Sequence, residues 1–167
     1  VAFYRQPPES VVATGGEPRL SNRMRERLAL AIMSAVGAHY LAGRPPWTLA
    51  QLCQLLRVPK HAVETMLAAL QSGGLLVQSK DDAGAYLPAR DLGAISLKQL
   101  LDLVRSAGES RFLAPAGLPV PERVEQILQG IDGSLGAALE GISVLDLAAG
   151  RAVGPAPGPT AATRQGG

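Results

Sequence analysis

The sequence predicts a mainly α-helical fold with one small β-hairpin, which is an α+β fold. Apolar residues recur at three- and four-residue steps in several segments that end at Gly or Pro, a pattern typical of amphipathic helices. One pair of short apolar segments, separated by a polar turn at 80–84, has the pattern of a hairpin. Hydrophobic residues make up 47% of the chain and aromatic residues only 4%, so the core is expected to consist of aliphatic side chains.

The domain is expected to span residues 21–148, between two ends of different composition. Residues 1–20 are rich in Pro, Gly and Glu without periodicity, which predicts a linker or arm. Residues 151–167 contain three prolines and several glycines, which predicts a flexible tail. A chain of 167 residues suits a single domain with loose ends, and a first residue other than Met is expected of a fragment or of a processed product.

The first predicted helix begins at a Ser21 or Asn22 cap and runs to about Leu41, before Gly43 and a Pro-Pro pair. Its middle is apolar almost all round, as in helices that lie at the centre of a fold. We therefore expect its large apolar side chains to be buried, namely Leu28, Leu30, Ile32, Met33, Val36 and Tyr40.

Two further helices are predicted before the hairpin. Thr48 is the expected cap of a short helix with one apolar face, formed by Leu49, Leu52, Leu55 and Leu56. After a Val58-Pro59 turn, a helix over about 60–72 has a buried stripe and ends at Gly73-Gly74. That stripe consists of Val63, Met66, Leu67 and Leu70.

The hairpin is predicted to pair strands 75–78 and 85–87, with Pro88 ending the second strand. Ser96 is the expected cap of a fourth helix. Two shorter helices, at about 122–131 and 134–147, are predicted after a proline-rich loop. Their apolar sides are expected to pack on the first helix or to form a dimer face, and the sequence leaves both open.

Helix, short helix, turn, helix and hairpin is the element order of a winged helix-turn-helix, here with extra C-terminal helices. In that architecture the helix before the hairpin can enter the major groove of DNA. Its polar side carries Lys60, His61 and Thr65, and Arg57 in the turn and Lys80 in the wing can support it.

The charge pattern of this surface is weak for a DNA reader. Glu64 opposes Lys60 on the same helix, and Asp81 and Asp82 at the wing tip would repel phosphate. The formal net charge of the chain is only +2. The pattern leaves DNA binding and protein contact open and favours protein contact.

A second basic cluster, formed by Arg19, Arg23, Arg25 and Arg27, lies around the start of the first helix. It suits either a solvated helix start or a segment beside the anionic head groups of a membrane. The chain itself is not expected to cross a bilayer. Its longest uncharged stretch, Leu28 to Gly43, has 16 residues and includes a Ser, a His and two glycines.

No catalytic, metal or phosphate-binding motif is present in the sequence, so we expect neither an enzymatic site nor a cofactor. The two histidines, His39 and His61, have no paired spacing, and His39 is expected to be a packed or capping side chain. Cys53 is the only cysteine, which rules out an internal disulfide and fits a buried structural thiol.

Residues 47–106 resemble the winged-helix domain of bacterial repressors that sense iron–sulfur clusters or cysteine supply. The shared pieces include Thr48-Leu49-Ala50, Gly84-Ala85-Tyr86 in the wing and Ile95-Ser96-Leu97 after it. The resemblance implies a winged-helix fold and DNA binding. The cluster-sensing repressors hold their cofactor with cysteines after the wing, and this chain has none there, so no cluster is expected.

Residues 20–148 resemble more closely the cytoplasmic C-terminal domain of YihY/BrkB-type bacterial inner-membrane proteins, a family labelled ribonuclease BN. The matching stretches include Ala89-Arg90-Asp91-Leu92 and the segment 142–147. This resemblance implies a place on the cytoplasmic side of the inner membrane, after a membrane region that precedes residue 1. It also implies a protein partner or the protein's own membrane domain as the contact.

Three functions follow from these patterns. The leading hypothesis is a non-catalytic regulatory or interaction domain of such a membrane protein. The first alternative is a DNA-binding transcriptional regulator, and the second is an accessory part of a tRNA-processing ribonuclease. DNA, RNA and a second copy of the chain are therefore further candidate partners.

Overall fold

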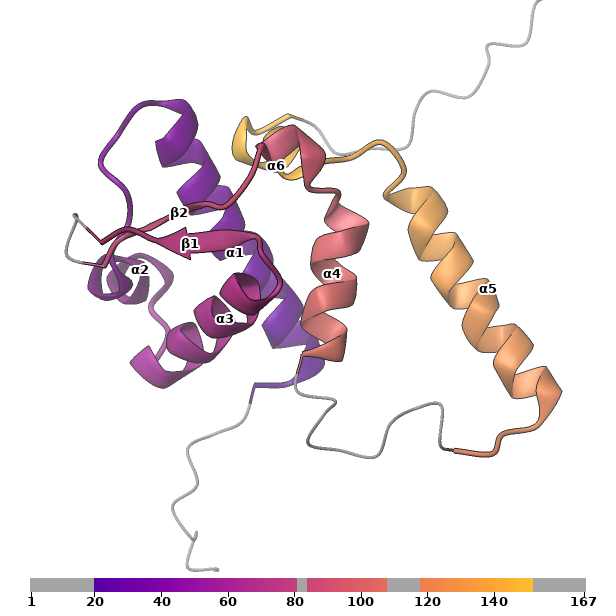
Figure 1. Cartoon of the computed structure of the whole chain (residues 1–167). Helices are drawn as coiled ribbons and strands as arrows, with labels where there is room; N and C mark the ends of the chain where they lie inside the picture. Colours follow the sequence, from indigo (N-terminus) through magenta and orange to yellow (C-terminus); the bar gives the residue numbers. More distant parts are fainter. Residues whose placement is uncertain (1–19, 81–83, 108–117, 152–167) are drawn as a thin grey trace, which may run out of the picture.

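The computed structural model describes residues 20–80, 84–107 and 118–151, and it confirms the α+β fold (Figure 1). Most of the predicted arm, the wing tip with Asp81 and Asp82, and the predicted tail from residue 152 lie outside the described residues. The described elements are α1 Asn22–Leu41, α2 Leu49–Leu56, α3 Lys60–Ser72, β1 Leu76–Gln78, β2 Tyr86–Pro88, the 3₁₀ helix η1 Leu92–Ala94, α4 Leu97–Ser106, α5 Glu122–Ala138 and α6 Val144–Ala148.

Helix α1 is the central element, and α3, α4 and α6 pack around it. Ser21 caps it as predicted, since its hydroxyl accepts a hydrogen bond from the Met24 amide at 3.3 Å. The prediction for Tyr40 is wrong, because this residue, in the last turn of α1, is 55% exposed. Leu30 is only half-buried. The residues of α1 that are buried therefore lie in its middle turns, along one side of the helix.

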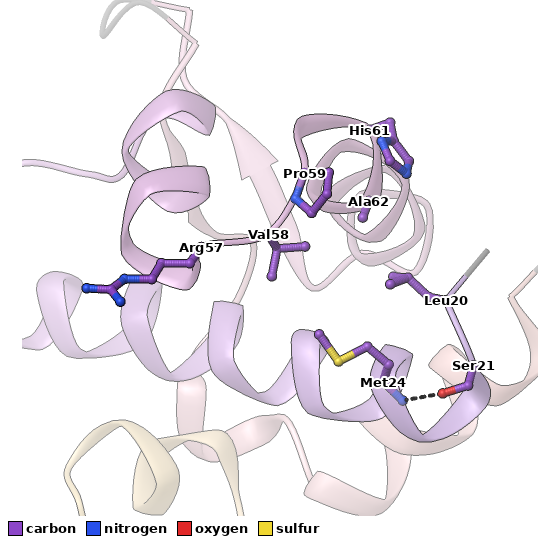
Figure 2. Close-up of a pocket in the computed structure, with 8 residues that line it drawn as sticks. All are labelled: Leu20, Ser21, Met24, Arg57, Val58, Pro59, His61 and Ala62. Carbon is purple, nitrogen blue, oxygen red and sulfur yellow. Dashed lines mark hydrogen bonds between the residues drawn. The ribbon is translucent and has the colours of Figure 1, made fainter. Parts of the chain in front are cut away.

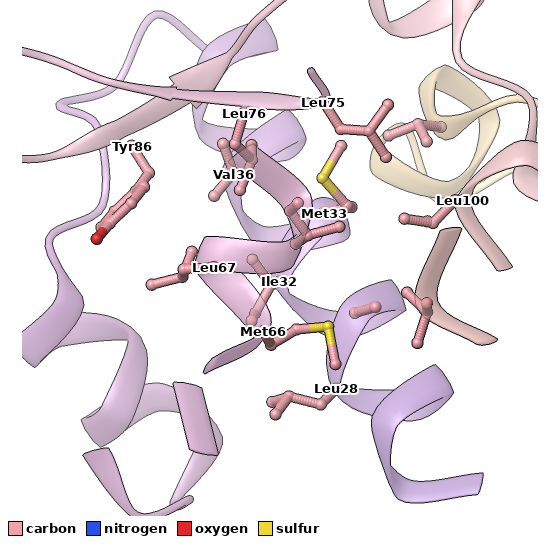
Figure 3. Packing of buried hydrophobic residues seen from close by; sticks show 14 of the residues in the cluster. Leu28, Ile32, Met33, Val36, Met66, Leu67, Leu75, Leu76, Tyr86 and Leu100 are labelled. Carbon is pink, nitrogen blue, oxygen red and sulfur yellow. The ribbon is translucent and has the colours of Figure 1, made fainter. Parts of the chain in front are cut away.

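Helices α2 and α3 have the predicted positions. Thr48 and Gln51 form a reciprocal capping box at the start of α2. Of the predicted face of α2, only Leu52 is fully buried, and Leu55 is 49% exposed, because this short helix packs mainly on α3. The stripe on α3 is buried as predicted and meets α1 in the core (Figure 3).

The wing is an antiparallel pair in which Val77 lies opposite Leu87, and its second strand includes Pro88. The Tyr86 amide also donates to the Trp47 carbonyl at 2.8 Å, so β2 lies between β1 and Trp47, two residues before α2. The Trp47 indole N–H in turn donates to the Ala35 carbonyl of α1 at 3.0 Å. These bonds connect the wing to the central helix.

The C-terminal part differs from the prediction. Helices were predicted at 122–131 and 134–147. In the structure α5 covers the first of these and continues into the start of the second, and α6 is all that remains of the second helix beyond it. Helix α5 continues through Gly133, because a single Gly inside a helix costs only about 1 kcal/mol relative to Ala. The break comes at Gly141, which has a φ of +72°.

Helix α6 begins with a Ser143–Asp146 capping box. The hydrogen bonds from the Ser143 hydroxyl and amide, and then the Arg151 guanidinium, lower the pKa of Asp146 below its ordinary value. Because the pKa of Asp146 is lower in the folded state, its carboxylate contributes to folding stability above the unfolded-state pKa. This contribution is lost as the pH falls through the folded-state pKa.

The chain after α5 returns to the core. The Leu97 amide donates to the Ile142 carbonyl at 3.0 Å, and the Val144 amide donates to the Ile95 carbonyl at 2.8 Å. Helix α6 then packs on α1, where a Cβ atom placed on Gly37 would lie 2.7 Å from the Cβ of Ala148. The absence of a side chain at Gly37 therefore permits this close helix contact.

Substitution Gly37→Ala is expected to destabilise the fold by about 1–3 kcal/mol, because the new methyl group must push α6 away. This cost exceeds the gain of about 1 kcal/mol that Ala has over Gly inside a helix. The Ala148→Gly substitution makes room for the methyl group, so the loss in the double variant is expected to be smaller than the sum of the two single losses. Urea denaturation of the four proteins of this cycle measures the coupling, and strictly additive losses would contradict the packing argument.

Candidate nucleic-acid interface

The outer face of α3 is a candidate reading surface, because its apolar stripe turns the polar residues away from the core. Lys60, Glu64, Thr65 and Ala68 are exposed. The Lys60 ammonium lies 3.4 Å from the Glu64 carboxylate. The Thr65 hydroxyl donates to the His61 carbonyl at 2.8 Å, so it is oriented along the helix. The face therefore presents one partly neutralised cation and small polar groups.

The wing borders this face on one side. A cavity of about 710 Å³ lies where α2, the start of α3 and the wing meet. It is lined by Thr48, Leu49, Ala50, Cys53, Lys60, Gln78, Gly84 and Tyr86. Lys80 is exposed two residues after the end of β1. Lys60 at the start of α3 and the wing residues Gln78 and Tyr86 therefore line the same cavity.

Cys53 and Tyr86 both line this cavity. Cys53 is half-buried and contributes to the cavity wall, whereas the sequence predicted a buried thiol. Burial, and then the charge of Glu64, raise the pKa of Tyr86, so its phenol is neutral at physiological pH. Neutral Tyr86 retains its hydroxyl as a hydrogen-bond donor beside the α3 face.

Arg57 and His61 lie on the opposite side of the turn, away from the wing cavity. Both line an apolar pocket of about 430 Å³ that also includes Leu20, Ser21 and Met24 from the start of α1 (Figure 2). The pocket is completed by Val58, Pro59 and Ala62. The predicted nucleic-acid set is therefore divided between two sides of α3, and sequence spacing contained no signal for this division.

The basic cluster of α1 is also divided. The Arg25 guanidinium donates to the Ala107 carbonyl, and Glu26 accepts from Arg105 at 2.7 Å, so both residues connect α1 to the end of α4. Arg23 and Arg27 are exposed, and their side chains form no hydrogen bond or ion pair with any described residue. Arg19 lies outside the described residues.

Helix α5 carries a second candidate surface, and this one is apolar. It has no buried residue, and it stands away from the core along most of its length (Figure 1). Val124, Ile127, Leu128 and Ile131 are 39–59% exposed. Their three- and four-residue spacing places them on one face of the helix. The exposed Leu118 and Val120 precede this face along the chain.

The histidines do not form a reactive centre in the described part of the chain. His39 is packed as predicted: its ring lies 4.2 Å from the Trp47 ring, and its Nδ1 lies 3.0 Å from the Pro45 carbonyl oxygen. Within residues 20–80, 84–107 and 118–151, no three potential ligands are grouped to hold a metal ion. No described helix combines the length and apolar character needed to span a bilayer.

Solved structures of bacterial regulators are similar to this chain. CymR, the global cysteine regulator of B. subtilis, is 18% identical with a TM-score of 0.59, over 81% of this chain and 99% of that one. IscR of T. potens is 16% identical with a TM-score of 0.57, over 78% and 86%. A Listeria innocua protein described as a putative transcriptional regulator is 15% identical with a TM-score of 0.54, over 86% and 90%.

These similarities establish the winged-helix fold at low sequence identity. No protein-family model matches the chain, and no curated protein sequence matches it. The resemblance to YihY/BrkB-type membrane proteins therefore has no support from these comparisons, nor does a ribonuclease role. The resemblance to winged-helix regulators agrees with the structural neighbours.

Proposed function

We propose that this chain is a DNA-binding winged-helix regulator that acts as a homodimer. The observation that carries the proposal is the outer face of α3, which is polar, exposed and bordered by the wing. This is the arrangement with which winged-helix proteins place a helix in the major groove. The structural neighbours that share the fold include a global cysteine regulator, which supports a regulatory role.

In this proposal α3 enters the major groove with its N-terminal half. Thr65 and Lys60 are the expected contacts to base edges and phosphates, and Lys80 and Gln78 of the wing are expected to contact the adjacent backbone. The weak charge of one chain limits the number of phosphate contacts. Two chains on one site double these contacts, so a dimer suits this surface better than a monomer.

The apolar face of α5 is the proposed dimer contact. Together with Leu118 and Val120, it leaves six large apolar side chains 36–66% exposed on each chain. Apolar side chains gathered on one exposed face often mark a protein–protein contact. A second copy offers the same face, which allows a symmetric pairing of the two helices.

The test is a selection of duplexes from a random-sequence DNA library with the full chain, followed by anisotropy titrations of an enriched duplex. Lys60→Ala and Thr65→Ala are each expected to weaken binding about tenfold, in the range of one lost base or charged contact. Gln99→Ala, at an exposed position on α4, is the control and is expected to leave binding unchanged.

Failure to enrich any sequence, together with no duplex binding at low salt, would show that the proposed function is wrong. Equal binding by Thr65→Ala, Lys60→Ala and the control would instead show that DNA binding uses a surface other than the α3 face.

A further inference from the structure

We infer that Arg23, Arg27 and Arg57 form a basic strip that binds the DNA phosphate backbone beside the α3 site. This inference rests on the proposed function and deepens it, because it adds a second contact surface to the same complex. The sequence had assigned these residues to two unrelated sets, a recognition set and a membrane-proximal set.

The tertiary structure brings the two sets together. The first turn of α1, with Ser21 and Met24, and the turn at Arg57 line the same pocket, which extends to the start of α3 (Figure 2). In Figure 1 the N-terminal ends of α1 and α3 both lie at the lower side of the molecule. Arg23 precedes Met24 on α1 and Arg27 follows it by three residues, and both are exposed.

The arginines of α1 differ in what they contact. Arg25 contacts the end of α4, and its neighbour Glu26 binds Arg105 there. Arg23 and Arg27 are four residues apart, which places both on the solvent side of the helix. Two like charges at this spacing repel, and Arg23, in the first turn, also opposes the helix dipole. The first turn has no acidic residue to offset them, so their presence does not serve the helix.

Arg57 provides an independent observation. It is the C-cap of α2, with φ +53° and ψ 41°, and no other described residue except glycine has a positive φ. Gly adopts this left-handed conformation without steric cost, whereas an Arg is strained in it. Its side chain is exposed, forms no hydrogen bond or ion pair with a described residue, and extends away from His61 in Figure 2. An arginine in place of the favoured glycine indicates that the guanidinium makes a contact outside the chain.

A duplex fits this strip better than a membrane surface does. Arg57 lies in the turn that leads into α3, and Arg23 and Arg27 lie on the helix whose first turn lines the same pocket, so we expect a duplex held by α3 to pass along them. Phosphate contacts of this kind position a protein on DNA without reading sequence. The strip is therefore expected to contribute equally to all duplexes, whereas the α3 face distinguishes among them.

The experiment uses the full chain and compares Arg23→Ala/Arg27→Ala with Arg90→Ala/Lys98→Ala. Both pairs remove two charges, and the control pair lies on the η1 and α4 side of the fold. Anisotropy titrations against an enriched duplex and a scrambled duplex are repeated over a range of salt concentrations. The strip variant is expected to lose about tenfold or more in affinity for both duplexes. Its slope of log K against log salt is expected to shrink by about 1.8, or 0.9 per lost phosphate contact.

Arg57→Gly supplies a second readout. We expect its melting temperature to rise, because the strain is relieved, while its affinity for both duplexes and its salt slope fall. A merely structural role for Arg57 would leave DNA affinity unchanged. A loss of affinity through misfolding would be accompanied by a lower melting temperature.

If the wild-type chain binds DNA and the strip variant matches the control in affinity and slope, the inference is wrong and the proposed function stands. If the wild-type chain binds no duplex at low salt, both the inference and the proposed function are wrong. A parallel arm uses vesicles of phosphatidylserine and phosphatidylcholine. Binding of the wild-type chain to vesicles but not to DNA, abolished in Arg23→Ala/Arg27→Ala, would assign the arginines to a membrane surface instead.

Discussion

Replacing Ile127 and Ile131 by Glu is expected to convert a dimer of this chain into monomers. Both side chains are more than half exposed, at 56% and 59%, on the apolar face of α5. At a closed dimer interface each would be fully desolvated, and a buried unpaired carboxylate costs several kcal/mol. Sedimentation equilibrium of the wild-type chain and the double variant measures the change. A loss of a hundredfold or more in affinity for an enriched two-site duplex is expected with it.

The matched control for this prediction is Gln126→Glu/Gln129→Glu, which adds the same two negative charges on the opposite face of α5. It is expected to remain dimeric. Because the structure shows no buried residue on α5, the monomeric Ile127→Glu/Ile131→Glu variant is expected to keep its helical circular-dichroism spectrum. A wild-type chain that is monomeric at every concentration would contradict the assignment of α5 to a dimer contact.

Leu67→Ala is expected to lower the free energy of unfolding by about 2–5 kcal/mol. Leu67 is 1% exposed and lies in the core between α1 and the wing (Figure 3). Its truncation removes apolar burial and leaves a cavity where α3 meets the wing, so the loss also loosens the candidate reading surface. Urea denaturation monitored by circular dichroism measures the effect.

The control substitution is Leu55→Ala, which removes the same atoms from a side chain that is 49% exposed. Its expected cost is below about 1 kcal/mol, because a surface site is already hydrated and no closed cavity forms. Equal losses for the two variants would mean that α3 does not bury its apolar stripe as the structure has it.

The local parts of the fold follow directly from the sequence. The caps Ser21, Thr48 and Ser96 and the bounds of α3 are where the sequence predicts them, because capping and helical periodicity act over three or four neighbouring residues. The predicted break within α5 is wrong because a Gly inside a helix costs only about 1 kcal/mol relative to Ala and does not by itself end the helix. The sequence did not predict the exposure of Tyr40 and Leu55. Apolar periodicity indicates which face of a helix can be buried, whereas the neighbouring elements decide how many residues of that face are covered.

The candidate site was predicted only in part. The sequence identified the polar face of α3, since a buried stripe at 63–70 leaves the opposite face exposed. It gave Arg57, in the turn, a supporting role beside that face and assigned the arginines of α1 to another function. The pocket that joins Met24 to Arg57 depends on how α1 crosses the turn before α3, and no local pattern encodes that crossing.

Local sequence patterns therefore account for the element order, the helix starts and the aliphatic core, and from these for the winged-helix architecture. The tertiary structure decided which apolar residues are covered and which charges meet. Leu67 is buried while Leu55 and Ile131 are not, and Arg25 contacts α4 while Arg23 and Arg27 remain exposed. The physical reason is range: caps and periodicity are set by residues within one or two turns, whereas burial and charge proximity depend on segments brought together from distant parts of the chain.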